Sequence, residues 1–383
     1  MINRLLLALF IVSFSTYTFA QNVDSLQSRL PSAEGTEKVN ILNKLFIAYN
    51  QIDPTKALEH AKNALELASE LNYSKGKAAA LNNMGVIYKN QGIYDRALQF
   101  YIQSLRLSDQ LEDSLGLAST MNNIGTVYSL QGVYDKALIY FIESHDLFKS
   151  LGDDERLIGT LNNIGNAYND NGRADKALEY FNQSIALSKK SAMRHSSSDP
   201  LNNIGNIYYY NSEYDKALDY YSQSLAVEKE SNNLLGQAQA YTNIGSVYLK
   251  LADPDKAEES QQRALQIAQQ IDANPMLKLI YKNLSDIYKY RDNYKKAYDY
   301  RVLYDEIRDI IQSEENNRAL AQFEVAFELQ QKDKELEVLK QEKKIQDLQV
   351  EKSRIIILLA LMGAMMIVGA GFTFYKLKTI NKI

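Results

Sequence analysis

Residues 161–165 read LNNIG, and this pentapeptide recurs along the chain at a fixed spacing. The other copies read LNNMG at 81–85, MNNIG at 121–125, LNNIG at 201–205 and YTNIG at 241–245, with a diverged copy, YKNLS, at 281–285. Each copy begins 40 residues after the one before it. A constant period of this length indicates a repeat protein, in which one supersecondary unit is stacked many times.

Other residue types recur in register with the pentapeptide. A tyrosine follows the glycine by three residues, an alanine by twelve and, in four copies, an aromatic residue by sixteen. The glycines are Gly85, Gly125, Gly165, Gly205 and Gly245; the tyrosines are Tyr88, Tyr128, Tyr168, Tyr208, Tyr248 and Tyr288; the alanines are Ala97, Ala137, Ala177, Ala217, Ala257 and Ala297; and the aromatics are Tyr101, Phe141, Phe181 and Tyr221. An earlier unit with a shorter turn fits Phe46, Tyr49, Ala57 and Ala61, so about seven units span residues 38–312.

Spacing within one unit predicts two helices joined by a turn. Leu81, Met84 and Tyr88 share one face of a helix, and a second amphipathic pattern starts at Ala97 after the turn at 91–95. Acidic residues fall where the second helices should begin, at the positive end of the helix dipole. They are Asp95, Asp135, Asp175, Asp215 and Asp255.

Three proline motifs predict helix starts. Asp53-Pro54 and Asp253-Pro254 fit an N-cap followed by proline at the first helical position. Ser198-Asp199-Pro200 should start the first helix of the fifth unit in the same way.

The small and aromatic columns have a structural interpretation. We expect the glycine of the first helix to face the alanine of the second, so that the two helices cross closely. The aromatic columns should fill the space between successive hairpins. A single hairpin cannot bury its apolar face, so the prediction is an all-α solenoid of stacked hairpins.

These columns resemble the tetratricopeptide repeat, which has the same order of leucine, glycine, tyrosine, alanine and aromatic residue. The resemblance covers residues 38–312, although the period exceeds the usual 34 residues and Asp109 stands where a closing proline would fall. The resemblance implies that the first helices line an inner groove. It also implies that asparagines there grip the backbone of an extended peptide.

The candidate binding residues are therefore the asparagines of the pentapeptide and their neighbours in the groove. The second asparagines are Asn83, Asn123, Asn163, Asn203, Asn243 and Asn283; the first are Asn82, Asn122, Asn162 and Asn202; the neighbours are Asn166, Asn206 and Tyr209. An amide can both donate to and accept from a peptide unit. The alternative is that these amides only join neighbouring hairpins through backbone hydrogen bonds. Both readings, or a mixture of the two, fit the sequence.

Composition argues against several other functions. The formal charge is −4, so we expect no nucleic acid partner, and with no cysteine there can be no disulfide or thiolate site. The three histidines, His60, His145 and His195, are far apart in a solenoid, and no phosphate-binding glycine loop occurs. The prediction is a non-enzymatic protein without a metal or cofactor.

Both ends of the chain carry targeting patterns. Residues 1–20 have the charged start, apolar run and small-residue end of a secretory signal peptide, and 21–37 form a lead into the repeats. Residues 355–375 carry no charge, and about 30 Å of helix would cross a bilayer. We therefore expect a single-pass protein of the inner membrane whose repeats are exported, to the periplasm in a Gram-negative cell. The tail 376–383 should remain cytoplasmic.

Residues 313–354 contain no proline or glycine and are rich in Glu, Lys and Gln. Their apolar residues follow an interrupted heptad pattern, so we expect a long charged helix that is either a coiled coil or a single solvated helix. Residues 313–375 are a candidate homodimer contact.

The order of segments resembles the sensory half of tetratricopeptide-containing sensor kinases and membrane regulators of Bacteroidetes. In those proteins an output domain follows the span, whereas only eight residues follow it here, 376–383. The expectation is a truncated member or a chain that signals through a partner, without kinase activity of its own. The leading function is a membrane-anchored receptor for a peptide or protein segment. The alternative is a static scaffold that assembles exported proteins.

Overall fold

The computed structural model describes residues 23–50 and 53–380, and beyond Asn316 it describes the side chains of only part of the residues. The signal peptide predicted at 1–20 lies outside these residues. In the described part of the chain there is no strand, residues 23–29 are helical, and two short 3-10 helices occur, η1 (Leu30–Ser32) and η2 (Arg194–Ser197). The main helices there are α2 (Gly35–Tyr49), α3 (Pro54–Glu70), α4 (Ser74–Asn90), α5 (Tyr94–Gln110), α6 (Ser114–Leu130), α7 (Tyr134–Leu151), α8 (Asp154–Asp170), α9 (Ala174–Lys190), α10 (Ser198–Tyr210), α11 (Tyr214–Glu230), α12 (Leu234–Lys250), α13 (Pro254–Gln270), α14 (Asn274–Tyr290) and α15 (Tyr294–Ile380).

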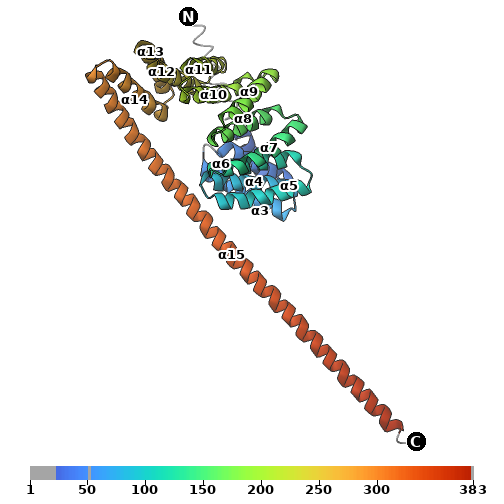
Figure 1. The fold of residues 1–383 in the computed structure, drawn as a ribbon. Coiled ribbons are helices and arrows are strands. Elements are labelled where there is room, and N and C mark those ends of the chain that lie inside the picture. Colours follow the sequence, from blue (N-terminus) through green and yellow to red (C-terminus); the bar gives the residue numbers. More distant parts are fainter. Residues whose placement is uncertain (1–22, 51–52, 381–383) are drawn as a thin grey trace. The chain divides into compact units, whose positions relative to one another are not determined.

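The helices pair into hairpins that stack along the chain (Figure 1). Each even-numbered helix from α2 to α12 packs against the helix that follows it, and each odd-numbered helix from α3 to α13 also packs against the next hairpin. The seventh hairpin joins α14 to the first turns of α15, where the Ser285 hydroxyl donates to the Ala297 carbonyl at 2.8 Å. Successive first helices such as α4 and α6 also contact each other, so they lie on the inner side of the solenoid. The predicted all-α solenoid is confirmed.

Four of the five column glycines pack under a ring from the second helix of their own hairpin, whereas Gly245 packs under the amide side chain of Gln261. A Cβ added at Gly165 would lie 2.5 Å from Phe181, and one at Gly85 would lie 2.5 Å from Tyr101. Gly125 meets Phe141 and Gly205 meets Tyr221 in the same manner. The expectation that glycine faces the alanine column was therefore wrong. The missing side chain makes room for an aromatic ring, and the alanine lies one helical turn before that ring.

The tyrosine column stacks against a second aromatic column. Tyr88 and Phe100 stack with ring centroids 5.1 Å apart, and Tyr168 and Tyr180 do so at 5.4 Å. These pairs join the two helices of one hairpin. The sequence analysis had instead placed the aromatic columns between successive hairpins. Tyr168 also packs against the apolar cluster of the preceding helix α7, so it serves both contacts.

A lysine from the second helix covers the outer face of several of these tyrosines. The ammonium group lies 5.3 Å from the ring centroid for Lys136 over Tyr128 and 4.9 Å for Lys216 over Tyr208. A cation over an exposed ring contributes about 0.5–1 kcal/mol.

Buried serines tie the two helices of a hairpin by hydrogen bonds. Ser104 donates to the Ala78 carbonyl at 2.8 Å, and Ser144 donates to the Ala118 carbonyl at 2.8 Å. Ser184 and Ser224 repeat this contact at 3.2 Å. A buried hydroxyl needs such a partner, and a helical carbonyl has a second lone pair to accept it.

Two of the three proline motifs behave as predicted. The Asp53 carboxylate accepts from the Lys56 amide, and Asp253 accepts from Lys256, each ahead of a proline in the first turn. The third motif was misplaced, because α10 begins at Ser198 and Pro200 is its third residue. Proline is tolerated there because the first N–H groups of a helix have no intrahelical acceptor.

The lead predicted at 21–37 packs onto the first hairpin. Leu30 lies against the apolar cluster of Leu42 and Ala64, and Arg29 forms an ion pair with Glu37 at 2.8 Å. Helix α2 begins at Gly35, three residues before the predicted start of the repeats at 38.

Residues 317–383 belong to a second unit, which we describe by itself. They are helical to Ile380 as part of α15, so the helix predicted at 313–354 is confirmed, and its pairing as a coiled coil or homodimer stays a prediction. Among the residues whose placement is described, no helix combines the length and apolar character needed to cross a membrane. Most side chains of 355–375 lie outside that set, so the predicted span is not found there and stays a prediction.

Replacing Gly165 by alanine should lower the free energy of unfolding by about 1–3 kcal/mol, because the new Cβ overlaps the Phe181 ring. Gly159→Ala on the same helix is the matched control, because nothing lies within 4 Å of a Cβ at Gly159. That change should instead stabilise by about 0.5–1 kcal/mol through helix propensity. Urea denaturation followed by circular dichroism measures both, and equal effects would contradict the packing described here.

Candidate functional site

The asparagines of the pentapeptide form a ladder of side-chain hydrogen bonds between repeats. In each contact, the second asparagine of one repeat donates from Nδ2 to Oδ1 of the first asparagine in the preceding repeat. The bonds are Asn123 to Asn82 at 2.9 Å, Asn163 to Asn122 at 3.1 Å, Asn203 to Asn162 at 3.2 Å and Asn243 to Asn202 at 2.7 Å. We call these eight residues the asparagine ladder. All of them are half-buried on the first helices.

The pattern changes where the sequence pattern changes. Asn83 donates to Asn43 at 2.8 Å, because leucine stands at the first position of that earlier repeat. Asn283 donates to the Ser246 hydroxyl at 3.3 Å, because the first position there is Thr242, whose hydroxyl donates to the Ala238 carbonyl. The predicted residues of this column thus lie in one line along the inner side of the solenoid.

The neighbouring candidates also lie beside the ladder. Asn166 Oδ1 accepts a second hydrogen bond from Asn203 at 3.0 Å, and Asn206 Oδ1 accepts from the Tyr221 hydroxyl at 2.7 Å. Tyr209 is half-buried with its ring edge-on to Tyr214, and burial raises its pKa. Burial likewise raises the pKa of Tyr221.

The ladder leaves polar atoms unused. Within the described residues, the Nδ2 groups of Asn82, Asn122, Asn162 and Asn202 donate to no protein atom, and the Oδ1 atoms of their donors accept from none. The amides therefore join neighbouring hairpins, as one alternative held, through side chains rather than the backbone. They also present fixed donors and acceptors to the groove, which suits a peptide backbone.

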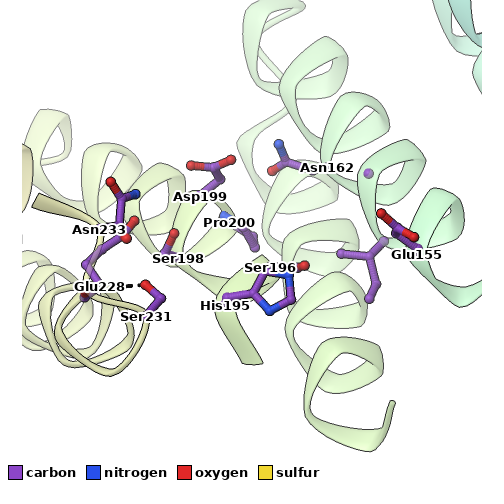
Figure 2. Close-up of a pocket in the computed structure, with 12 residues that line it drawn as sticks. Glu155, Asn162, His195, Ser196, Ser198, Asp199, Pro200, Glu228, Ser231 and Asn233 are labelled. Carbon is purple, nitrogen blue, oxygen red and sulfur yellow. Dashed lines mark hydrogen bonds between the residues drawn. The ribbon is translucent and has the colours of Figure 1, made fainter. Parts of the chain in front are cut away.

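Two cavities open beside the ladder. One, of about 350 Å³, is lined by residues that include Asn43, Asn82 and Asn83. The other, of about 530 Å³, is lined by Asn162 and by residues from α8, α10 and α11 (Figure 2). The sequence analysis missed Glu228 in the second cavity. The charge of Glu228 could have revealed it, because the equivalent positions in other repeats are Ser108, Phe148, Ser188 and Ala268.

The histidines do not come together in the structure. His60 lies in α3 against the Tyr49 ring, and burial lowers its pKa. His145 in α7 is within 2.9 Å of Asp146, and His195 lies in η2. In the part of the chain that the structure describes, no cluster of residues could hold a metal ion.

Comparison with family models decides the family. The model of the tetratricopeptide repeat matches residues 39–110, 76–150, 116–190, 156–230, 196–270 and 236–300, which together cover more than half of the chain. The chain belongs to the tetratricopeptide repeat family. A search of curated proteins found no match.

Solved tetratricopeptide structures share this fold at low identity. A signal transduction ATPase with a tetratricopeptide repeat sensor from Pyrococcus horikoshii is 15% identical with a TM-score of 0.59, over 74% of this chain and 46% of that one. Aspartyl phosphate phosphatase F from Bacillus subtilis is 17% identical with a TM-score of 0.54, over 80% and 92%. BtubC from P. vanneervenii is 22% identical with a TM-score of 0.52, over 57% and 92%. At these identities the similarity concerns the fold.

Exchanging single asparagines for aspartate should separate the donor and acceptor columns. Asn163→Asp removes the donor and sets a carboxylate 3.1 Å from Asn122 Oδ1, so we expect a loss of about 1–3 kcal/mol in unfolding free energy. Asn122→Asp adds the same charge at the acceptor of this bond. The new carboxylate still accepts from Asn163, so the loss in unfolding free energy should be smaller. Urea denaturation measures both, and a larger loss for Asn122→Asp would reverse the assigned direction of the bond.

Proposed function

We propose that this tetratricopeptide protein binds an extended peptide or flexible protein segment along its asparagine ladder. The observation that carries the proposal is the pairing of the amides. Each ladder bond fixes the orientation of two side chains, so their unused N–H and carbonyl groups are already arranged before a ligand arrives. Such prior ordering lowers the entropy that binding must overcome.

The surroundings of the ladder support a backbone ligand. The candidate residues beside it are neutral amides and a tyrosine, and the two cavities interrupt the inner surface near Asn82 and Asn162. An extended strand has a donor and an acceptor on every residue. It can therefore use several ladder positions in sequence without needing a particular side chain at each one.

The proposed role is sensory. The P. horikoshii protein of similar fold is a signal transduction ATPase whose tetratricopeptide repeats are its sensor. We extend the same role to this chain, with the repeats exported and the binding event passed to a partner. The alternative function is a static scaffold that assembles exported proteins.

Membrane anchoring is the second part of the proposal. It rests on the uncharged sequence of 355–375 and on the described side chains at its start. Ile355, Ile356, Ile357 and Leu358 are each more than half exposed, although four consecutive residues cover every side of a helix. Exposed apolar surface on all sides of a helix favours burial in lipid.

Binding can be tested with the full chain and a library of random seven-residue peptides displayed on phage. Asn122→Asp with Asn202→Asp keeps both ladder acceptors but replaces two free N–H donors by oxygens. For selected peptides we expect affinity to fall at least about tenfold, because each backbone carbonyl loses its partner.

The control for this pair is Asn72→Asp with Asn211→Asp, which adds the same charge at exposed turn positions away from the ladder. Unchanged affinity in the ladder variant would overturn the proposal. Selection of folded proteins but no peptide from matched libraries would support the scaffold instead.

Membrane anchoring can be tested by fractionating a Gram-negative host that expresses the full chain. We expect the chain in the inner membrane, resistant to extraction with carbonate and released by detergent. Met362→Lys with Met365→Lys should weaken insertion by about 2.5–3.5 kcal/mol per lysine and release the chain. Leu348→Lys with Val350→Lys, before the span, is the control that should stay membrane-bound, and a wild-type chain in the soluble fraction would refute anchoring.

A further inference from the structure

The fifth repeat departs from the others at the start of its first helix. Helices α8 and α12 have 17 residues each, whereas α10 has 13, and the 3-10 helix η2 takes the place of the missing first turn. The cavity of about 530 Å³ lies between this altered start and Asn162 of the asparagine ladder (Figure 2).

Glu228 lies at this cavity with its side chain buried. Only 6% of the residue is exposed, and within the described residues its carboxylate has no hydrogen bond or ion pair. Gly236 makes room for it, because an added Cβ there would lie 2.2 Å from the Glu228 carboxyl carbon. The Gly236 amide does not compensate the charge, since it donates to Asn233 at 3.3 Å.

The Glu228 carboxylate oxygens keep contact with solvent, although most of the residue is buried. A carboxylate with few surrounding waters attracts a nearby cation more strongly than a fully solvated carboxylate does. The first turn of α12 supplies only the partial positive charge of its helix dipole. The protein therefore keeps an uncompensated acceptor at the wall of an open cavity, where a ligand cation can reach it.

The remaining lining of the cavity favours the same ligand charge. Glu155 on α8 and Asp199 on α10 are exposed at its edge, and neither has an ion pair among the described residues. His195 is the basic side chain of the lining. Ile158 and Pro200 add apolar surface that an alkyl chain can contact.

We propose that this cavity binds a cationic group, an ammonium or guanidinium, carried by the peptide that the ladder holds. The proposal rests on the proposed peptide-binding function and adds a side-chain preference to it. Asn162 belongs to both features, so a backbone held at Asn162 places a neighbouring side chain or its amino terminus at the cavity. Glu228 is the principal partner of the cation, and Glu155 and Asp199 contribute longer-range attraction.

The test uses the full chain and three synthetic seven-residue peptides of serine and alanine, measured by calorimetry. The first is acetylated at its amino terminus and has one central lysine. The second carries Nε-acetyllysine at that position, which keeps the alkyl chain and removes the charge. The third has a free amino terminus and a central glutamine. We expect the lysine peptide to bind at least about tenfold more tightly than the acetyllysine peptide. Tight binding of the third peptide instead would identify the amino terminus as the source of the cation.

Glu228→Gln should abolish this preference while leaving the acetyllysine peptide bound as before. Glu230→Gln is the matched control, because Glu230 is exposed on the same helix, two residues further on, and does not line the cavity. Circular dichroism checks that both variants fold. Equal affinity for all three peptides in the wild-type chain would overturn the cation site and leave peptide binding intact. Binding of none of them, together with failure of the library selection, would overturn both proposals.

Discussion

The contact between a bare glycine and an aromatic ring sets the distance between the two helices in four consecutive hairpins, from α4 to α11. Because a Cβ at Gly165 would lie 2.5 Å from Phe181, any other residue there forces the ring or the helix to move. Interiors packed at crystal density cannot absorb such a shift locally. The same four hairpins also carry the stacked aromatic pairs and the buried serine hydrogen bonds described above. Two hairpins replace this contact: Gly245 packs under Gln261, whose amide donates to the Thr242 carbonyl, and Ser285 takes the place of the glycine and donates to the Ala297 carbonyl.

The asparagine ladder depends on that regular packing, and our proposal gives it ligand binding as a second role. An amide has more hydrogen-bonding groups than one inter-repeat contact can use, so structure and binding do not compete for it. The bond between Asn163 and Asn122 holds two hairpins in register and also fixes two side chains toward the groove. A serine or threonine at the same place has fewer groups left over, as at Thr242, whose hydroxyl donates to its own helix. The choice of asparagine is therefore informative where packing alone would accept several residues.

Much of the solenoid could be predicted, because a repeated column reports the same environment several times. The partner of the glycine could not, since Ala177 and Phe181 are four residues apart and share one helix face. Which of them lies opposite Gly165 depends on how the two helices cross, and the spacing of residues along the sequence does not determine that crossing. The ladder partners, 41 residues apart, depend in the same way on the rotation between repeats. Glu228 was visible as an exception in its column, but the cavity that it lines depends on how α8, α10 and α11 pack, which the column does not contain. The role of 355–375 depends on whether lipid or water surrounds it, which the fold of the chain does not determine.

The single glutamate of its column, Glu228, has a consequence for how a ligand aligns on a repetitive surface. Equivalent amides recur at regular intervals along the groove. A strand held only by these amides therefore has several alignments of nearly equal binding free energy. It could slide by one repeat and lose only the contacts at one end. Glu228 removes this degeneracy, because only one alignment brings a given ligand residue to Asn162 and Glu228 together. In the proposed complex, the fifth repeat thus sets the position along the groove at which a given ligand residue must lie.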